Sequence, residues 1–138
     1  DDRYLIGRST RTNKEGGDFL ASQVKKDGYD AEFITVPDTT LHLTTVCSSP
    51  REGTMIAAEG HLTEHQLSNF AEEILWIPNK ESYASNTIGY SNDRLIIAAG
   101  FPKTKNILQN EGFRLMSVDM APIMQADGSL TCLSVFTT

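Results

Sequence analysis

Cysteine is scarce in this 138-residue chain, which contains only Cys47 and Cys132. Two cysteines are too few for a disulfide scaffold, and the chain has no CxxC motif or paired Cys/His spacing that would indicate zinc. Long apolar runs are also missing, because no stretch approaches the roughly 18 residues of a membrane span. We see no signal peptide. The sequence therefore predicts a protein of the reducing cytoplasm with no metal, no cofactor and no membrane partner.

Basic residues are also in short supply. Lysine and arginine number 12 against 18 acidic residues, which gives a net charge of −6 and a pI of about 4.9. Nucleic acid or an anionic membrane would require a basic patch, so the composition disfavours both, whereas a small cationic substrate is compatible with it. The apolar content of 39% is ordinary for a globular protein. We expect a single domain over residues 1–138.

Helix and strand signals alternate along the chain, which indicates an α/β fold. Asn13 can cap a helix that begins at Lys14. The apolar spacing of this helix predicts a buried stripe of Phe19, Leu20 and Val24. Strands are expected on either side of it, over Arg3–Gly7 and Glu32–Val36.

The remainder of the chain contains further strands separated by two helix signals. Thr63 and Gln66 form a capping box, and Pro102 occupies the favoured first position of a helix. We expect a polar loop over Asn79–Ser85 and a short helical turn over Met120–Met124. The strands expected in this region are Leu41–Ser48, Thr54–Ala58, Ile74–Ile77, Thr87–Tyr90, Arg94–Ala99, Phe113–Val118 and Leu130–Phe136.

These elements form a repeat of strand, strand, helix and strand, with a period of roughly 40 residues. One copy runs from Leu41 to Ile77 and the next from Thr87 to Val118. An earlier copy lacks its opening strand, and a later one would consist only of Leu130–Phe136. Such a unit cannot bury its sheet face alone, so the copies must pack together. Because both ends are incomplete, we expect about half of a closed structure, completed by another copy or another polypeptide.

The best candidate for chemistry is Cys132, within Asp127–Ser134 near the end of the chain. A lone cysteine is more often a buried small hydrophobe than a nucleophile, and chemistry would need a second group. His42 is the candidate, although a core or capping histidine is the ordinary alternative. Cys47, in a stretch rich in Thr and Val, is expected to belong to the core.

Four segments stand out in order along the chain: Arg8–Asn13 before a helix, Leu41–Leu43, Ile77–Lys80 and Asp127–Cys132. Together, in this order, they resemble the dimethylarginine dimethylaminohydrolases. These enzymes belong to the guanidine-modifying superfamily, with arginine deiminases and amidinotransferases. The resemblance covers the C-terminal half of the family, and it implies a five-bladed α/β propeller (the pentein fold) of strand-strand-helix-strand units.

The resemblance also implies roles for individual residues. Cys132 would be the nucleophile and His42 the general acid and base. Arg11 would bind the α-carboxylate of the substrate, although by residue type alone it could be a solvated loop arginine. Asp127 and the backbone of Ala126 would close over the substrate. The carboxylates that clamp the guanidinium in the family have no match in this chain.

The function implied is hydrolysis of a methylated arginine to citrulline and an amine, through a covalent thiouronium on cysteine. The alternatives are an arginine deiminase-like or amidinotransferase-related enzyme, or a half-domain with a structural or binding role and no turnover of its own. The partners expected are a small cationic guanidino compound and either a second copy of the chain or a complementary N-terminal half.

Overall fold

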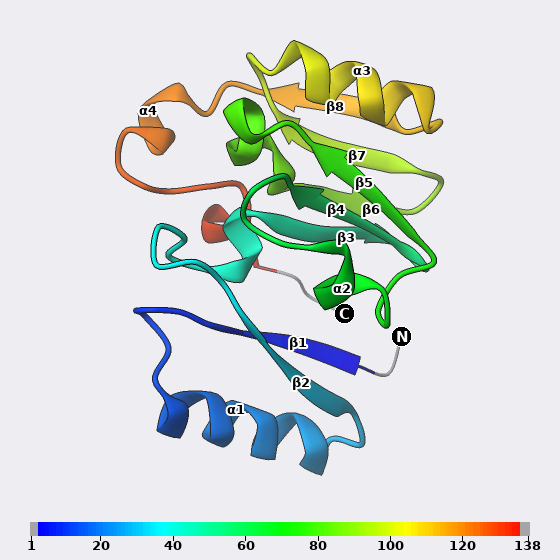
Figure 1. The fold of residues 1–138 in the computed structure, drawn as a ribbon. Helices are drawn as coiled ribbons and strands as arrows, with labels where there is room; N and C mark the ends of the chain where they lie inside the picture. Colours follow the sequence, from blue (N-terminus) through cyan, green and yellow to red (C-terminus); the bar gives the residue numbers. More distant parts are fainter. Residues whose placement is uncertain (1–2, 136–138) are drawn as a thin grey trace. The chain divides into compact units, whose positions relative to one another are not determined.

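A computed structural model describes residues 3–135 (Figure 1). The chain divides into two compact units, residues 1–43 and 44–138, and each is described by itself. None of the helices in the described part combines the length and the hydropathy needed to cross a bilayer.

The first unit consists of strand β1 (Arg3–Arg8), helix α1 (Lys14–Lys26) and strand β2 (Asp30–Thr35). The two strands pair in parallel, as a crossover through a helix requires, and α1 runs alongside them (Figure 1). The predicted cap is confirmed, because the side chain of Asn13 accepts a hydrogen bond from the backbone N–H of Gly16 at 2.9 Å. This cap fixes where the helix begins.

The predicted apolar stripe of α1 is only partly correct. Val24 is buried, but Phe19 is 67% exposed and Leu20 is 48% exposed. The buried face is completed by Gly17 and Ala21 instead. A Cβ at Gly17 would lie 2.8 Å from the Phe33 ring, so the helix packs on β2 through small residues that permit close approach.

The second unit contains two copies of the predicted repeat. In each copy the first two strands pair antiparallel and the last two pair in parallel, so each forms a small mixed sheet of three strands. The strand-strand-helix-strand pattern is therefore confirmed for these two copies. Their elements are β3 (Cys47–Arg51), β4 (Thr54–Ala58), α2 (Glu64–Leu67), β5 (Glu73–Ile77), and then β6 (Ile88–Tyr90), β7 (Arg94–Ala98), α3 (Pro102–Asn110) and β8 (Arg114–Val118).

The two sheets share one hydrophobic core. Ile56, Leu75 and Ile77 of the first sheet pack with Leu95 and Ile97 of the second, and each of these side chains is at most 6% exposed. Helix α3 adds Leu108 to the same cluster. Each repeat therefore buries a sheet face against its neighbour, as the pattern of the sequence requires.

The predicted strand Leu41–Ser48 is wrong over residues 41–46 and correct only for Cys47 and Ser48. Residues Leu43–Thr45 form a short 3₁₀ helix, η1, and β3 begins only at Cys47 and continues to Arg51. Threonine and valine favour a strand by propensity, but the carbonyl of Thr44 accepts a hydrogen bond from the side chain of Asn86. A tertiary contact therefore overrides the local preference.

Two further expectations are corrected. Residues Asn79–Ser85 form a 3₁₀ segment, η2, instead of an open loop. The predicted strand Leu130–Phe136 is wrong over its described part, because Thr131–Leu133 form a 3₁₀ turn, η3, and Ser134 and Val135 belong to no strand. Phe136 lies outside the described residues. The short helix after Met120 is confirmed as α4 (Ala121–Met124).

Candidate cysteine site

The thiol of Cys132 is exposed in the short turn η3. The backbone N–H of Cys132 donates to the carbonyl of Ser129 at 3.1 Å, which closes the turn. The Ser129 hydroxyl lies 3.2 Å from Sγ of Cys132, and Ser129 is 2% exposed. A buried hydroxyl at this distance can donate to a thiolate, so the turn presents the sulfur to solvent with one polar partner already in place.

The amide of Asn86 holds this turn. It is 1% exposed, and its nitrogen donates to the carbonyl of Thr44 at 2.5 Å and to the hydroxyl of Thr131 at 2.8 Å. Its oxygen accepts from the backbone N–H of Thr131 at 3.0 Å. One side chain therefore joins Thr131 of η3 to Thr44 of η1, both within the second unit. A buried amide with all three bonds made is strongly constrained in position.

A second anchor comes from Tyr83 of η2. Its hydroxyl donates to the carbonyl of Gly128 at 2.8 Å, and its ring stacks on Phe101 at a centroid distance of 5.7 Å. Burial raises the pKa of Tyr83, and a negative charge on the nearby Cys132 raises it further. The phenol therefore stays protonated and keeps donating to the turn. Residues 128–131 are therefore held at one end by Tyr83 of η2 and at the other by Asn86, which directly follows η2.

The segment η2 is itself fixed through Glu81. The Glu81 carboxylate accepts hydrogen bonds from the backbone N–H groups of Lys103 at 3.2 Å and Thr104 at 2.7 Å, and from the Thr104 hydroxyl at 2.8 Å. Burial raises its pKa, but these hydrogen bonds lower it by more, so the net shift is downward. Glu81 thereby caps the N-terminus of α3 with a carboxylate, which the helix dipole favours.

Ala126 and Asp127 lie in the turn that follows α4, and both are exposed. Asp127 has a positive φ of 56°, a conformation that only aspartate, asparagine and glycine adopt readily. The turn is closed by a hydrogen bond from the N–H of Gly128 to the carbonyl of Ile123 at 3.0 Å. These two residues therefore stand next to the cysteine turn in the chain and face solvent.

Arg11 and His42 belong to the first unit, and the structure brings their segments together. The Ser9 hydroxyl accepts from the backbone N–H of Arg11 at 3.1 Å and donates to the carbonyl of Leu41 at 2.7 Å. Arg11 and His42 are both exposed. Ser9 thus ties the loop of Arg11 to the residue before His42.

The other cysteine has a different environment. Cys47 is 5% exposed, and burial raises its pKa to about 12. A thiol with that pKa is not ionised at neutral pH and is a poor nucleophile. The prediction that Cys47 is a core residue is confirmed.

A hollow of about 430 Å³ lies beside this site, at the ends of β7 and β8. Cys132 and Asp127 are not among its lining residues. Among residues 3–135 we find no cluster of three or more His, Cys, Asp or Glu side chains that could hold a metal ion. The hollow is lined by Tyr83, Ala99, Gly100, Phe101, Asp119, Met120, Ala121 and Met124.

Several residues that shape the site had no motif to reveal them. No sequence motif marks Asn86, Ser9 or Ser129 as part of the site. The available signal for Asn86 was weak: a polar amide placed directly before an apolar strand. Its hydrogen-bond partners are 42 and 45 positions away, so local spacing could not identify them.

No family model matches the chain. Individual relatives do: it is 31% identical over 134 residues to the N(G),N(G)-dimethylarginine dimethylaminohydrolase of Pseudomonas aeruginosa, covering 97% of this chain and 51% of that protein. The enzyme of the same name from Streptomyces coelicolor is 30% identical over 135 residues, with 97% and 50% covered.

Solved structures give the same result. A Pseudomonas aeruginosa dimethylarginine dimethylaminohydrolase with a cysteine-to-serine substitution, complexed with citrulline, superposes with a TM-score of 0.85 at 30% identity and covers 96% of this chain and 50% of its own. An amidinotransferase of Microseira wollei shares the fold with a TM-score of 0.84 at 16% identity, with 99% and 46% covered.

The fold is therefore an α/β fold that matches half of the pentein fold. The chain is a homologue of the dimethylarginine dimethylaminohydrolase and amidinotransferase superfamily, and it spans about half the length of the curated relatives it matches.

Proposed function

We propose that the chain forms the cysteine-bearing half of a cytoplasmic hydrolase of guanidino compounds, dimethylargininase-like in its chemistry. The observation that carries the proposal is the exposed thiol of Cys132 in a turn anchored by Asn86 and Tyr83, beside the hydroxyl of Ser129. The names of the relatives support the choice of reaction.

The proposed reaction begins with attack by the Cys132 thiolate on the central carbon of the guanidinium. This carbon is a poor electrophile because of resonance, so a strong nucleophile is needed. A C–S bond forms, and the C–N bond to the methylated nitrogen breaks. His42 donates a proton to the departing amine, which leaves a thiouronium on the cysteine.

Water completes the cycle. His42, now neutral, takes a proton from the attacking water, a C–O bond forms, and the C–S bond breaks to release citrulline and the thiolate. Arg11 binds the α-carboxylate of the substrate, since a guanidinium fork suits a carboxylate. Asp127 and the backbone of Ala126 close over the substrate. The chain and a complementary N-terminal half together form the closed five-bladed propeller, and that half supplies the carboxylates around the guanidinium.

The test is a turnover assay with dimethylarginine, arginine and agmatine, made on the chain alone and with the complementary half added. We expect citrulline from dimethylarginine only when both halves are present. Preference for arginine would instead assign a deiminase, and no product from any guanidine with both halves present would support the non-catalytic alternative.

A covalent trap tests the two proposed catalytic residues. In a histidine-to-glycine variant, a dimethylarginine dimethylaminohydrolase has been crystallised as an adduct with S-methyl-L-thiocitrulline. We expect His42→Gly, with its complementary half, to retain a mass adduct from this compound on Cys132. The adduct should vanish in the double variant with Cys132→Ala. An adduct that persists there would refute the assignment of the nucleophile.

A further inference from the structure

The hydroxyl of Ser129 is buried against the sulfur of the cysteine turn. Ser129 is 2% exposed, whereas Cys132 is exposed. Among the described residues, Sγ of Cys132 at 3.2 Å is the only hydrogen-bond partner of this hydroxyl. An ionised sulfur has no proton to donate, so with a thiolate the hydroxyl must be the donor.

The turn uses its other serine differently. The Ser134 hydroxyl donates to the carbonyl of Leu130 at 2.8 Å, which is a local bond to the backbone. The carbonyl of Ser129 itself accepts from the N–H of Cys132 at 3.1 Å. Leu130 is 7% exposed and packs into a hydrophobic cluster directly after Ser129. The two serines therefore form a matched pair, in which Ser129 contacts the sulfur and Ser134 contacts the backbone.

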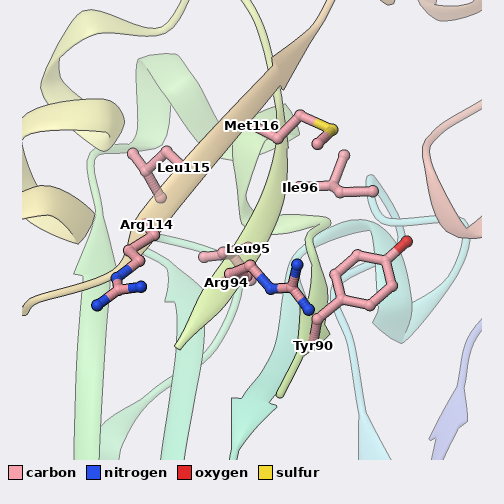
Figure 2. A pocket seen from close by; sticks show the side chains of 7 residues that line it. All are labelled: Tyr90, Arg94, Leu95, Ile96, Arg114, Leu115 and Met116. Carbon is pink, nitrogen blue, oxygen red and sulfur yellow. The ribbon is translucent and has the colours of Figure 1, made fainter. Parts of the chain in front are cut away.

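The arginines of the second unit are engaged elsewhere. Arg94 and Arg114 pair across β7 and β8 and line a hollow of about 350 Å³, of which Cys132 is not a lining residue (Figure 2). Arg51 is paired with two carboxylates, at 3.1 Å and 3.4 Å. Over residues 44–135 no lysine or arginine side chain hydrogen-bonds to Sγ of Cys132. Within this unit a thiolate therefore depends on a neutral donor.

The titratable side chains beside the turn do not replace this donor. Tyr83 stays protonated because burial and the charge of Cys132 raise its pKa, and its hydroxyl donates to the carbonyl of Gly128. Asp127 is exposed in the preceding turn, and an ionised carboxylate can only accept hydrogen bonds. Ser129 is thus the donor that the described residues of this unit provide to the sulfur.

We propose that Ser129 is a positioning residue of the cysteine site, whose hydroxyl donates to the Cys132 thiolate and holds the sulfur charged in its exposed turn. A hydrogen bond to the charged form of a group favours that form. The proton stays on the serine oxygen throughout. The role of Ser129 in turnover rests on the proposed function: the hydrogen bond is lost when the C–S bond forms and is remade when that bond breaks, so it favours the departure of citrulline.

The test uses the chain without substrate or complementary half, so a failure of the proposed function leaves it unaffected. Ultraviolet absorbance measures the thiolate at pH 8, and Cys47 does not contribute because its pKa is about 12. Ser129→Ala should lower the fraction of Cys132 thiolate by up to about tenfold, since a hydrogen bond to a charged group is lost. Alkylation by iodoacetamide should slow less, by about threefold, because a less stabilised thiolate is the better nucleophile.

The matched control is Ser134→Ala, which should keep the thiolate absorbance and the alkylation rate of the parent chain. Ser129→Thr retains a hydroxyl and should also behave like the parent, and a thermal melt checks that each variant is folded. The proposal is overturned if Ser129→Ala keeps the parent's thiolate absorbance, or if alkylation slows with no loss of thiolate. It is also overturned if Ser134→Ala has the same effect, or if a folded Ser129→Thr lacks the thiolate signal.

Discussion

The replacement of Asn86 by alanine is the sharpest perturbation of the cysteine site. It removes the two hydrogen bonds donated to Thr44 and Thr131 and the one accepted from the N–H of Thr131, and it touches no residue of the proposed chemistry. A buried hydrogen bond contributes about 1 kcal/mol to stability, and stranded partners cost more. We therefore expect the free energy of unfolding to fall by about 3 kcal/mol.

The neighbouring residue provides the control. Ser85 is fully buried, and its hydroxyl has no hydrogen-bond partner among the described residues. Ser85→Ala therefore removes no bond, and we expect stability to be unchanged or to rise by up to about 1 kcal/mol. Urea unfolding of both variants gives the comparison.

The site itself is monitored by hydrogen exchange. Since Asn86 holds the amide of Thr131 directly, residues 128–134 should exchange faster in Asn86→Ala by more than the general loss of stability explains. With the complementary half present, kcat should fall by about tenfold or more while KM changes little, because the thiol is displaced and substrate binding is not. A loss below about 1 kcal/mol, or exchange at residues 128–134 that merely follows global stability, would refute the role of Asn86.

Three further predictions concern other contacts. Glu81→Gln should cost about 1 kcal/mol at pH 7, because it weakens the carboxylate cap of α3. Since the pKa of Glu81 is lowered in the fold, this difference in stability should disappear as the pH falls through that lowered pKa, and a difference that persists in strong acid would contradict the prediction. The pKa of Cys47 rises from 9.0 to about 12 on folding, so the free energy of unfolding should fall by up to about 1.4 kcal/mol per pH unit above pH 9. Urea titrations of Cys47→Ala should show a flatter decline of stability with alkaline pH. An equal slope in the two proteins would show that Cys47 does not cause the decline. Ser9→Ala should lower the free energy of unfolding by about 1 kcal/mol. Because it loosens the loop of Arg11, it should raise KM more than it lowers kcat in the complemented enzyme. An effect on kcat alone would contradict the proposed role of this loop in substrate binding.

Elements with local signals could be predicted from the sequence. The cap at Asn13, the proline at the start of α3 and the hairpin turn at Asn92 and Asp93, both with positive φ, each act within a few residues. The strand-strand-helix-strand repeat followed from these signals, and the structure contains two copies of it.

The errors occur where a distant side chain decides the local structure. Thr44 and Thr131 both lie in segments with strand-like composition, and both bond to Asn86 instead of to a neighbouring strand. The segment η2 has few apolar residues, so its sequence resembles a loop, yet Glu81 and Tyr83 give it tertiary contacts. The resemblance indicated Cys132, but the exposed turn that presents it depends on contacts spanning about 45 residues.

The approach of β6 to β3 has a consequence for how the second unit unfolds. A Cβ on Gly89 would collide with the carbonyl of Pro50, and the Ser48 hydroxyl bridges to the carbonyl of Ser85 at 2.6 Å and to the Thr87 hydroxyl at 2.8 Å. The two backbones meet without room for a side chain between them. Neither repeat can therefore peel away while the other stays intact, and residues 44–135 should melt in one step, with Gly89→Val lowering the whole transition instead of splitting it.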